Sequence, residues 1–524
     1  MKAMQRHYES GSVEKIKKLL DKNPKMVLIH VTDTYFIEES NIDNTVDLPG
    51  FARLYSLIHR IRTDPVVQKN KVPVLVLHGG DFLYPSLMSI YFGGRQMVDI
   101  LNACGFDYCT LGNHDFDGGI ESLKTNMSNA SFEIICANIR NPKAKNSLKI
   151  SDYSIHLDNS NKLFMAITGI VGKATLRKAR QNGLETVPVE SSLKQTIGKI
   201  QKDHAEINHL VILSHMDNKE DDALLKFLDK NWDGYLYLFG GHDHNEILSY
   251  SDKNPKSVLL KGQSNCRTVQ IIGIPRLSNP QKTDSLQEQV IVMNSAELAM
   301  IPPNSEIQRK VRQWESKLEE YLDEQKSDRV IKRFKKETVL DATELQLRKG
   351  STNFGNFVAD CMLDFTGSDI ALINSGHFRG DRKIGNILKR SDLFRIFVLD
   401  KKDTLLKITM TRKECMQFLQ HAYSEEGRGK ILQVSKNAIE ILQESKPEDK
   451  LSVVMLWDML KTNDDGFATI LAKNRNATAS SIISGLKKHV ILGSSLFDVL
   501  EKSSKHVKYD PQVRISVEKS RFFS

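Results

Sequence analysis

The sequence predicts an α/β protein made of two domains joined by a helix. The chain has 524 residues, of which 40% are hydrophobic, so it can bury more than one core. From Met26 to about residue 300, short apolar runs alternate with longer amphipathic stretches, which is the pattern of an α/β domain with buried strands. A long helical pattern then separates this region from a second, mixed region.

Residues 1–25 are expected to form an N-terminal helix, because apolar residues recur at helical spacing in SVEKIKKLLDKNP, between Ser12 and Pro24. The first domain, residues 26–300, contains runs of aliphatic and β-branched residues of strand length. These runs are MVLIHV, VPVLVLHGG, YCTLG, EIICAN, LFMAITGIV, HLVILSH, YLYLFGG, SVLLKG and VQIIGI.

Residues 301–335 are expected to form a linker helix. Two prolines and a capping box of Ser305 and Gln308 precede apolar residues at helical spacing. The last region, residues 336–524, mixes strand-like runs such as SDIALIN and KLSVVML with helical patterns such as NFGNFVADCMLDFT. This mixture indicates an α+β domain.

Composition limits the partners and the location. The 74 basic and 65 acidic residues are interspersed, which suits a small anionic substrate and indicates no nucleic-acid polymer as partner. No apolar stretch is long enough to span a membrane, and the N-terminus lacks a signal-peptide core. The six cysteines lack C-x-x-C spacing, which is typical of reduced thiols. We therefore expect a cytoplasmic monomer or dimer without a membrane partner, although an unconventional export route would leave no mark in the sequence.

Residues able to bind metal follow several strand-like runs of the first domain. Parallel strands deliver their loops to one edge of a sheet, so we expect these side chains to meet. Imidazole, carboxylate and amide groups suit Mn, Zn, Fe or Co, and two divalent or mixed-valence ions together can activate a water for displacement at phosphorus. Asp81 would bridge the two ions, with Asn113, His215 and His242 on one ion and Asp33 and His244 on the other.

His114 is the predicted catalytic residue. It follows the expected ligand Asn113 in the sequence GNHD and need not bind metal itself. Facing the substrate, it could donate a proton to the leaving oxygen, with Asp115 holding its tautomer.

The motifs HGGDFLYPS, YCTLGNHDFDGG and GGHDHNE resemble those of the 5'-nucleotidase family of calcineurin-like metallophosphoesterases. The resemblance covers roughly residues 26–470. It implies a metallophosphoesterase α/β sandwich, followed by an α+β substrate domain of the 5'-nucleotidase C-terminal type. The implied reaction releases phosphate from a nucleotide or a related small phosphoester by attack of metal-bound hydroxide. LRKGSTNFGNFVADCM, LINSGHFR and NDDGF are similar to the family's substrate loops, which implies substrate binding by Arg348, Asn374, Gly376, Arg379 and Asp465.

One departure from the family pattern concerns the metal site. Tyr35, in HVTDTYFIEES, stands where the pattern has a histidine ligand. Three alternatives follow. His30 could substitute, but it is three residues before Asp33 and would point to the opposite face of an extended strand. The second metal could instead be held by fewer side chains and water, or by a phenolate, which would come from Tyr35 itself or from Tyr84. Tyr84 makes GDFLY match the G-D-x-x-Y motif of purple acid phosphatases.

The other departure concerns base recognition. The segment DKKD, residues 400–403, and Met459 stand where the family has two aromatic side chains that stack on the base, and His377 replaces a glycine. The alternative to an enzyme is therefore a non-catalytic or weakly active descendant that binds a phosphorylated ligand or a protein partner.

Overall fold

The computed structural model divides the chain into two compact units, Met1–Leu318 and Glu319–Ser524. The division falls within helix α12 (Ser305–Glu324), where the sequence predicts a linker helix; the exact bounds of the predicted domains stay predictions. Within the described residues, no helix has the length and apolar character needed to cross a membrane. The structure describes residues 11–42, 45–141, 148–158, 162–276, 286–324, 329–397, 404–424, 429–463, 465–508, 511 and 514.

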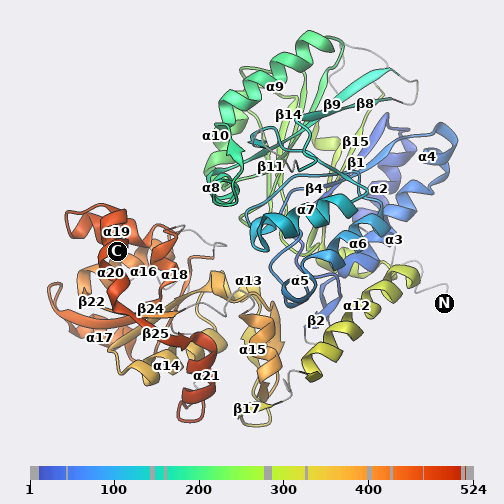
Figure 1. Cartoon of the computed structure of the whole chain (residues 1–524). Coiled ribbons are helices and arrows are strands. Elements are labelled where there is room, and N and C mark those ends of the chain that lie inside the picture. The colour runs from blue at the N-terminus through green and yellow to red at the C-terminus, as the bar shows by residue number, and fades with distance from the viewer. Residues whose placement is uncertain are drawn as a thin grey trace. The chain divides into compact units, whose positions relative to one another are not determined.

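The first unit contains two six-stranded sheets that pack face to face (Figure 1). One sheet has the order β16-β15-β1-β4-β5-β6 and the other has the order β13-β14-β12-β11-β9-β8. The strands of the first sheet are β16 (Val290–Asn294), β15 (Thr268–Ile274), β1 (Met26–Val31), β4 (Val74–His78), β5 (Tyr108–Cys109) and β6 (Glu133–Ile134). Those of the second are β13 (Ile247–Tyr250), β14 (Ser257–Lys261), β12 (Tyr235–Gly240), β11 (His209–His215), β9 (Leu163–Val171) and β8 (Tyr153–Leu157).

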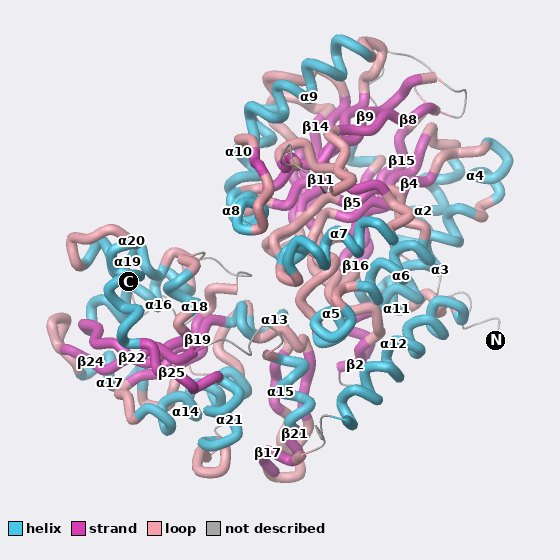
Figure 2. Tube along the Cα trace, viewed as in Figure 1, coloured by secondary structure: helices cyan, strands magenta, loops and turns pink. Residues whose placement is uncertain are grey.

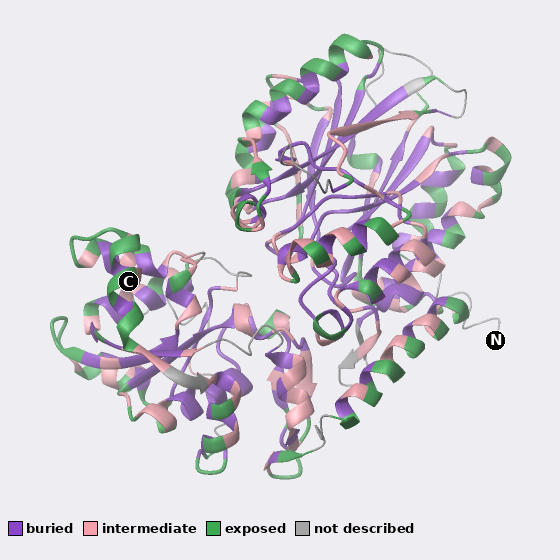
Figure 3. Cartoon of the chain, in the orientation of Figure 1, coloured by how far each residue is buried: buried purple, intermediate pink, exposed green. Residues whose placement is uncertain are grey.

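The central strands read as continuous apolar runs because both of their faces are covered. Every residue of β1, β11 and β12 is buried (Figure 3). One core lies between the sheets, and another packs the outer face of the second sheet against helices α9 and α10. The helices of this unit (Figure 2) are α2 (Ser12–Asp21), α3 (Gly50–Arg62), α4 (Pro65–Asn70), α5 (Leu87–Phe92), α6 (Arg95–Cys104), α7 (Gly119–Asn129), α8 (Lys173–Gln181), α9 (Val189–Asp203), α10 (Asn218–Leu228) and α11 (Ser295–Ala299).

In each of the two sheets, the strand register brings the residues predicted to bind metal to one edge. β1 and β4 are parallel, with Val31 opposite His78, and both strands end at this edge of the sheet. β11 and β12 are also parallel, with Ser214 opposite Gly240. Asp33, Asp81 and the histidines of the GGHDH motif follow β1, β4 and β12, and His215 is the last residue of β11, so the register places these predicted ligands at the carboxyl ends of neighbouring strands within each sheet.

The second unit has a five-stranded sheet of order β23-β19-β24-β22-β25 with helices packed on it. Its core is rich in aromatic residues, including Phe354 and Phe357 of α14. The two units have the α/β and α+β character that the sequence predicts. The strands of this sheet are β23 (Leu432–Val434), β19 (Ile370–Asn374), β24 (Lys450–Leu456), β22 (Thr404–Thr411) and β25 (Val490–Ser495). The helices are α13 (Glu344–Leu347), α14 (Asn353–Thr366), α15 (Arg390–Ile396), α16 (Arg412–Ala422), α17 (Ala438–Glu444), α18 (Asp458–Lys461), α19 (Phe467–Asn474), α20 (Ala479–Leu486) and α21 (Leu496–Ser503).

Short strands form two-stranded sheets in both units. They pair β2 (Ser40–Ile42) with β3 (Thr45–Leu48), β7 (Ile139–Arg140) with β10 (Glu185–Thr186), β17 (Val330–Arg333) with β21 (Ile387–Lys389), and β18 (Leu340–Ala342) with β20 (Arg382–Ile384).

Candidate metal centre

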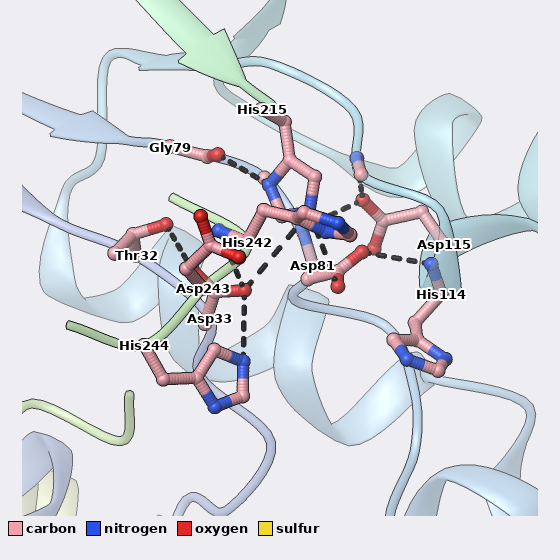
Figure 4. A network of polar contacts seen from close by, with 12 residues as sticks. Thr32, Asp33, Gly79, Asp81, His114, Asp115, His215, His242, Asp243 and His244 are labelled. Carbon is pink, nitrogen blue, oxygen red and sulfur yellow. Dashed lines mark hydrogen bonds and ion pairs between the residues drawn. The ribbon is translucent and has the colours of Figure 1, made fainter. Parts of the chain in front are cut away.

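Carboxylates and imidazoles from both sheets converge in the first unit (Figure 4). Ligand atoms of Asp33, Asp81 and His215 all lie within 4.8 Å of one another, and the three residues are buried. His215 Nε2 is 3.3 Å from Asp81 Oδ2, and His244 Nε2 is 3.2 Å from Asp33 Oδ1. The His242 ring packs against the His215 ring, with the centroids 5.1 Å apart. The structure therefore brings together ligands that the sequence predicts in separate loops.

Four of these residues have backbone conformations that L-amino acids rarely adopt. The φ angles are 51° for Asp33, 56° for Asp81, 81° for His242 and 58° for His244. Such left-handed conformations cost of order 1–3 kcal/mol each and persist where the surrounding structure enforces them. Here the His242 N–H donates to Asp33 Oδ2 at 3.0 Å, which ties two of the strained loops together.

Glycine is required where these loops approach most closely. A Cβ atom on Gly112 would lie 2.0 Å from Asp81 Oδ1, and one on Gly241 would lie 2.2 Å from Thr32 Oγ1. Both distances are far below contact distance. The glycines in GNHD and GGHDH therefore make room for the carboxylates and for the loop beside them.

The polar atoms of the site fit a bound cation. Asn113 Oδ1 and His215 Nε2 are buried and have no hydrogen-bond partner in the described part of the chain. Buried polar atoms are rarely left so, and an amide oxygen and an imidazole nitrogen are both ordinary metal ligands. His215 Nδ1 bonds to the Gly79 carbonyl at 2.9 Å, which fixes the ring so that Nε2 faces the carboxylates.

The electrostatics of the site also suit a cation. Burial alone would lower the pKa of His215, but Asp81 and Asp33 raise it to about 10. Burial alone would raise the pKa of Asp81, but His215 and His114 lower it to about 2. A neighbouring positive charge therefore stabilises the carboxylates of Asp33 and Asp81, and metal binding would displace the proton of the His215 imidazolium.

Tyr35 lies inside the cluster, whereas Tyr84 does not. The Tyr35 hydroxyl is 2.9 Å from His244 Nε2 and 3.2 Å from Asp33 Oδ1. The Tyr84 hydroxyl instead forms a hydrogen bond of 3.1 Å with Ser122 Oγ. Of the two tyrosines that the sequence offers as ligands, the structure thus brings only Tyr35 to the carboxylates.

The partner of His114 is Asp117 and not Asp115, which corrects the interpretation of the sequence. His114 Nδ1 is 2.6 Å from Asp117 Oδ2, and Asp117 Oδ1 also accepts from Lys178 Nζ at 2.8 Å. His114 is the first residue of the 3₁₀ helix η1 (His114–Phe116), and Asp117 is the residue directly after it. Residues three apart in a 3₁₀ helix lie on one face, so the two side chains meet. Burial alone would raise the pKa of Asp117, but His114 and Lys178 lower it.

Asp115 has a structural role. Its carboxylate accepts hydrogen bonds from the backbone N–H groups of Phe82 at 2.9 Å, Leu83 at 2.8 Å and Gly112 at 2.7 Å, and from Asp81 at 3.0 Å. It thereby holds the loops of Asp81 and Asn113 together.

A buried lysine that the sequence analysis missed supports the loop of His242 and His244. Lys261 is fully buried, and its Nζ lies 2.7 Å from Asp221 Oδ2 and 3.4 Å from Asp243 Oδ2. Ser214 Oγ donates to the other oxygen of Asp221 at 2.6 Å. A single lysine ending the apolar run SVLLKG was the available signal, because a charge at the end of a buried strand needs buried partners.

The second unit brings together part of the predicted substrate site. Asn374 Nδ2 donates to Asp465 Oδ2 at 2.8 Å, and Asn374 Oδ1 contacts His377 Nδ1. His421, which the sequence analysis missed, bonds through Nε2 to the Asp465 carbonyl at 2.6 Å. Gly376 lies in the same short 3₁₀ helix as His377, η3 (Ser375–His377).

The remaining residues predicted for the substrate site are two arginines and the positions where the family has aromatic side chains that stack on the base. The Arg348 guanidinium forms an ion pair with Glu344 at 2.7 Å. The backbone N–H of Arg379 donates to the Ile396 carbonyl at 2.7 Å. Met459 is buried in the core with 2% of its surface exposed, so it does not replace a stacking aromatic side chain. Residues 400–403 lie outside the described residues.

Sequence comparisons identify both domains. Residues 26–246 match the family model of calcineurin-like phosphoesterases, and residues 330–466 match that of the 5'-nucleotidase C-terminal domain. The chain is 22% identical to mouse 5'-nucleotidase over 455 residues, which cover 78% of this chain and 74% of the relative. It is also 22% identical to the trifunctional nucleotide phosphoesterase protein YfkN of Bacillus subtilis, over 86% of this chain but 31% of that protein.

Structural comparison gives the same fold. The 5'-nucleotidase precursor of Thermus thermophilus superposes with a TM-score of 0.65 at 17% identity, over 94% of this chain and 99% of that one. The 5'-nucleotidase of Candida albicans also gives 0.65, at 12% identity, over 91% and 98% of the two chains. The resemblance and the fold class predicted from the motifs are confirmed. The chain therefore belongs to the 5'-nucleotidase family of calcineurin-like metallophosphoesterases, which are metal-dependent phosphoester hydrolases.

Proposed function

We propose that this protein is a dinuclear metal phosphomonoesterase that releases phosphate from a nucleotide or a related small phosphoester. The observation that carries the proposal is the buried group of Asp33, Asp81 and His215, together with the buried Asn113 Oδ1 and His215 Nε2, which form no hydrogen bond within the described residues. A binding module would have little use for so complete a set of ligands placed on strained backbone.

Each residue of the cluster has a role in the proposal. Asp81 would be shared by two ions, with Asn113, His215 and His242 available to hold one of them and Asp33 and His244 available to hold the other. When bound, such a pair of ions lowers the pKa of a water and offsets negative charge on phosphoryl oxygens. Mn, Zn, Fe and Co are the candidate metals for this mixed nitrogen and oxygen set.

His114 acts as the proton donor to the leaving oxygen. Its backbone N–H donates to Asp81 Oδ1 at 2.8 Å, so the imidazole is anchored beside the proposed bridging carboxylate. With Nδ1 held by Asp117, Nε2 is the nitrogen that would transfer the proton.

The second unit is proposed to recognise the substrate. Asn374 and Asp465 are already paired and offer an amide and a carboxylate for hydroxyl groups, with Gly376 beside them. Arg348 and Arg379 are proposed to bind phosphate or sugar oxygens, for which a guanidinium has suitable geometry. The curated relatives are named for nucleotide substrates, which supports a nucleotide as substrate here.

We also infer that the protein works in the cytoplasm. All six cysteines are buried and unpaired, as is usual in a reducing compartment.

The test is phosphate release after reconstitution with Mn, Zn, Fe or Co. Nucleoside monophosphates and p-nitrophenyl phosphate are the substrates, and Asp81→Asn is the variant that removes the bridging charge. Asp152→Asn, which removes a surface carboxylate paired with Lys199, is the matched control. We expect activity in the wild type and in Asp152→Asn, and a loss of at least about 100-fold in Asp81→Asn. No release with any metal would overturn the proposal and favour a protein that binds a phosphorylated ligand.

A further inference from the structure

Tyr35 is held firmly within the proposed metal centre. The residue is 4% exposed, and its backbone N–H donates to Asn265 Oδ1 at 2.9 Å. The ring packs against the His244 ring with centroids 5.5 Å apart, and edge-on against His114 at 6.2 Å. The position of the hydroxyl is thus set by the backbone and by two neighbouring rings.

The hydroxyl oxygen of Tyr35 lies close to three atoms of the proposed metal ligands. Tyr35 Oη is 2.9 Å from His244 Nε2, 3.2 Å from Asp33 Oδ1 and 3.4 Å from Asp81 Oδ2. His244 Nε2 is 3.2 Å from Asp33 Oδ1. Ligand atoms about 2.1 Å from one cation are about 3.0 Å apart at right angles and about 3.4 Å apart at the tetrahedral angle. All four distances fall in or close to this interval.

The donor atoms on this side differ in charge and hardness from those on the other. Here a phenol oxygen, two carboxylates and one imidazole form a set of three oxygens and one nitrogen. The proposed ligands of the other ion, Asn113, His215 and His242, carry no negative charge when they bind a metal, so Asp81 would be that ion's one anionic protein ligand. Three anionic oxygens balance a trivalent ion, and hard oxygen donors favour hard cations. Zn²⁺ has no trivalent state, and of Mn, Fe and Co only iron is stable as a trivalent ion in aerobic water.

We propose that Tyr35 is a phenolate ligand, and that the centre pairs one ferric ion with one divalent ion. The ferric ion is held by Asp33, Tyr35, His244 and the shared Asp81. The divalent ion is held by Asn113, His215, His242 and Asp81. This inference rests on the proposed dinuclear site and specifies which metals it takes.

The 524-residue protein is incubated with equimolar Fe(III), Zn(II), Mn(II) and Co(II), dialysed, and then characterised by elemental analysis and visible absorption. We expect about one iron and one divalent ion per chain, with a visible charge-transfer band from phenolate to iron. Tyr35→Phe should lose the charge-transfer band, and its iron content per chain should fall about tenfold or more below that of the wild type. Tyr84→Phe is the matched control and should keep both, because the Tyr84 hydroxyl contacts Ser122 and not the cluster.

A second variant keeps the test decisive if Tyr35→Phe folds poorly. Tyr35→His restores a neutral ligand, so this variant should be colourless and hold two divalent ions. A colourless wild type with two divalent ions, a single divalent ion in the wild type, or a band that survives in Tyr35→Phe would overturn the proposal. Phosphate release measured on the same samples separates the two hypotheses. A colourless but active protein refutes only the ferric site, and a coloured but inactive one refutes only the hydrolase.

Discussion

Replacing His114 with alanine should slow hydrolysis in a way that depends on the leaving group. His114 is fixed through Asp117 at 2.6 Å and through its backbone bond to Asp81 at 2.8 Å, and in the proposed function its imidazole protonates the leaving oxygen. A nucleoside 5'-oxygen leaves poorly as an alkoxide and needs that proton. p-Nitrophenolate is stable as an anion and needs little help.

The magnitude follows from the contribution of a positioned general acid, which is typically about 10²–10⁴-fold, or about 3–5 kcal/mol of transition-state stabilisation. For a nucleoside monophosphate, we expect His114→Ala to lower kcat by that factor. For p-nitrophenyl phosphate, the loss should stay below about tenfold, because only the positioning contribution of the side chain is removed.

The assay is phosphate release from both substrates under identical metal loading. His59→Ala, which removes an exposed histidine of α3, is the matched control and should leave both rates unchanged. Equal losses on both substrates would refute proton donation and would assign His114 to substrate positioning. Unchanged rates would remove it from the reaction altogether.

Three further predictions concern Asp117, the buried Lys261 and the bound metal. Asp117→Asn should lower kcat for a nucleotide by roughly 10–100-fold with KM little changed, because His114 and Lys178 lose their shared carboxylate; a larger effect on KM would contradict this. Lys261→Met should lower the free energy of unfolding by about 3–5 kcal/mol, measured by urea titration, because Asp221 and Asp243 lose their buried cation; a change under about 1 kcal/mol would show that these carboxylates find another partner. Chelation should lower the melting temperature of the wild type reversibly but leave that of Asp81→Asn nearly unchanged, since only a bound ion stabilises the folded state; equal shifts in both proteins would contradict the assigned ligand.

The strand pattern and the motifs made it possible to predict the fold and most of the loops that form the candidate metal centre. Asp33, Asp81, Asn113, His215 and the GGHDH motif each follow an apolar run, and parallel strands bring such loops to one edge without knowledge of the packing. The sequence could also show that Tyr35 breaks the family pattern. It could not show where the phenol points, because side-chain direction in a loop depends on partners such as Asn265, which lies 230 residues away along the chain.

The errors and omissions have physical causes as well. Asp115 seemed the natural partner of His114 because it is adjacent, but the 3₁₀ geometry of η1 places Asp117 on the same face and turns Asp115 toward backbone N–H groups. Lys261 was missed because its carboxylate partners come from α10 and from the loop after β12. The left-handed φ angles of His242 and His244 could not be predicted from the sequence, since histidine is enriched at positive φ but still adopts it only rarely.

The most direct test titrates metal-free protein with metal ions while phosphate release from a nucleoside monophosphate is followed. If Asp81 bridges two ions that act together, activity should rise to its maximum at two equivalents per chain, and Asp81→Asn should stay inactive at every ratio. A maximum at one equivalent, or full activity in Asp81→Asn, would contradict the dinuclear centre.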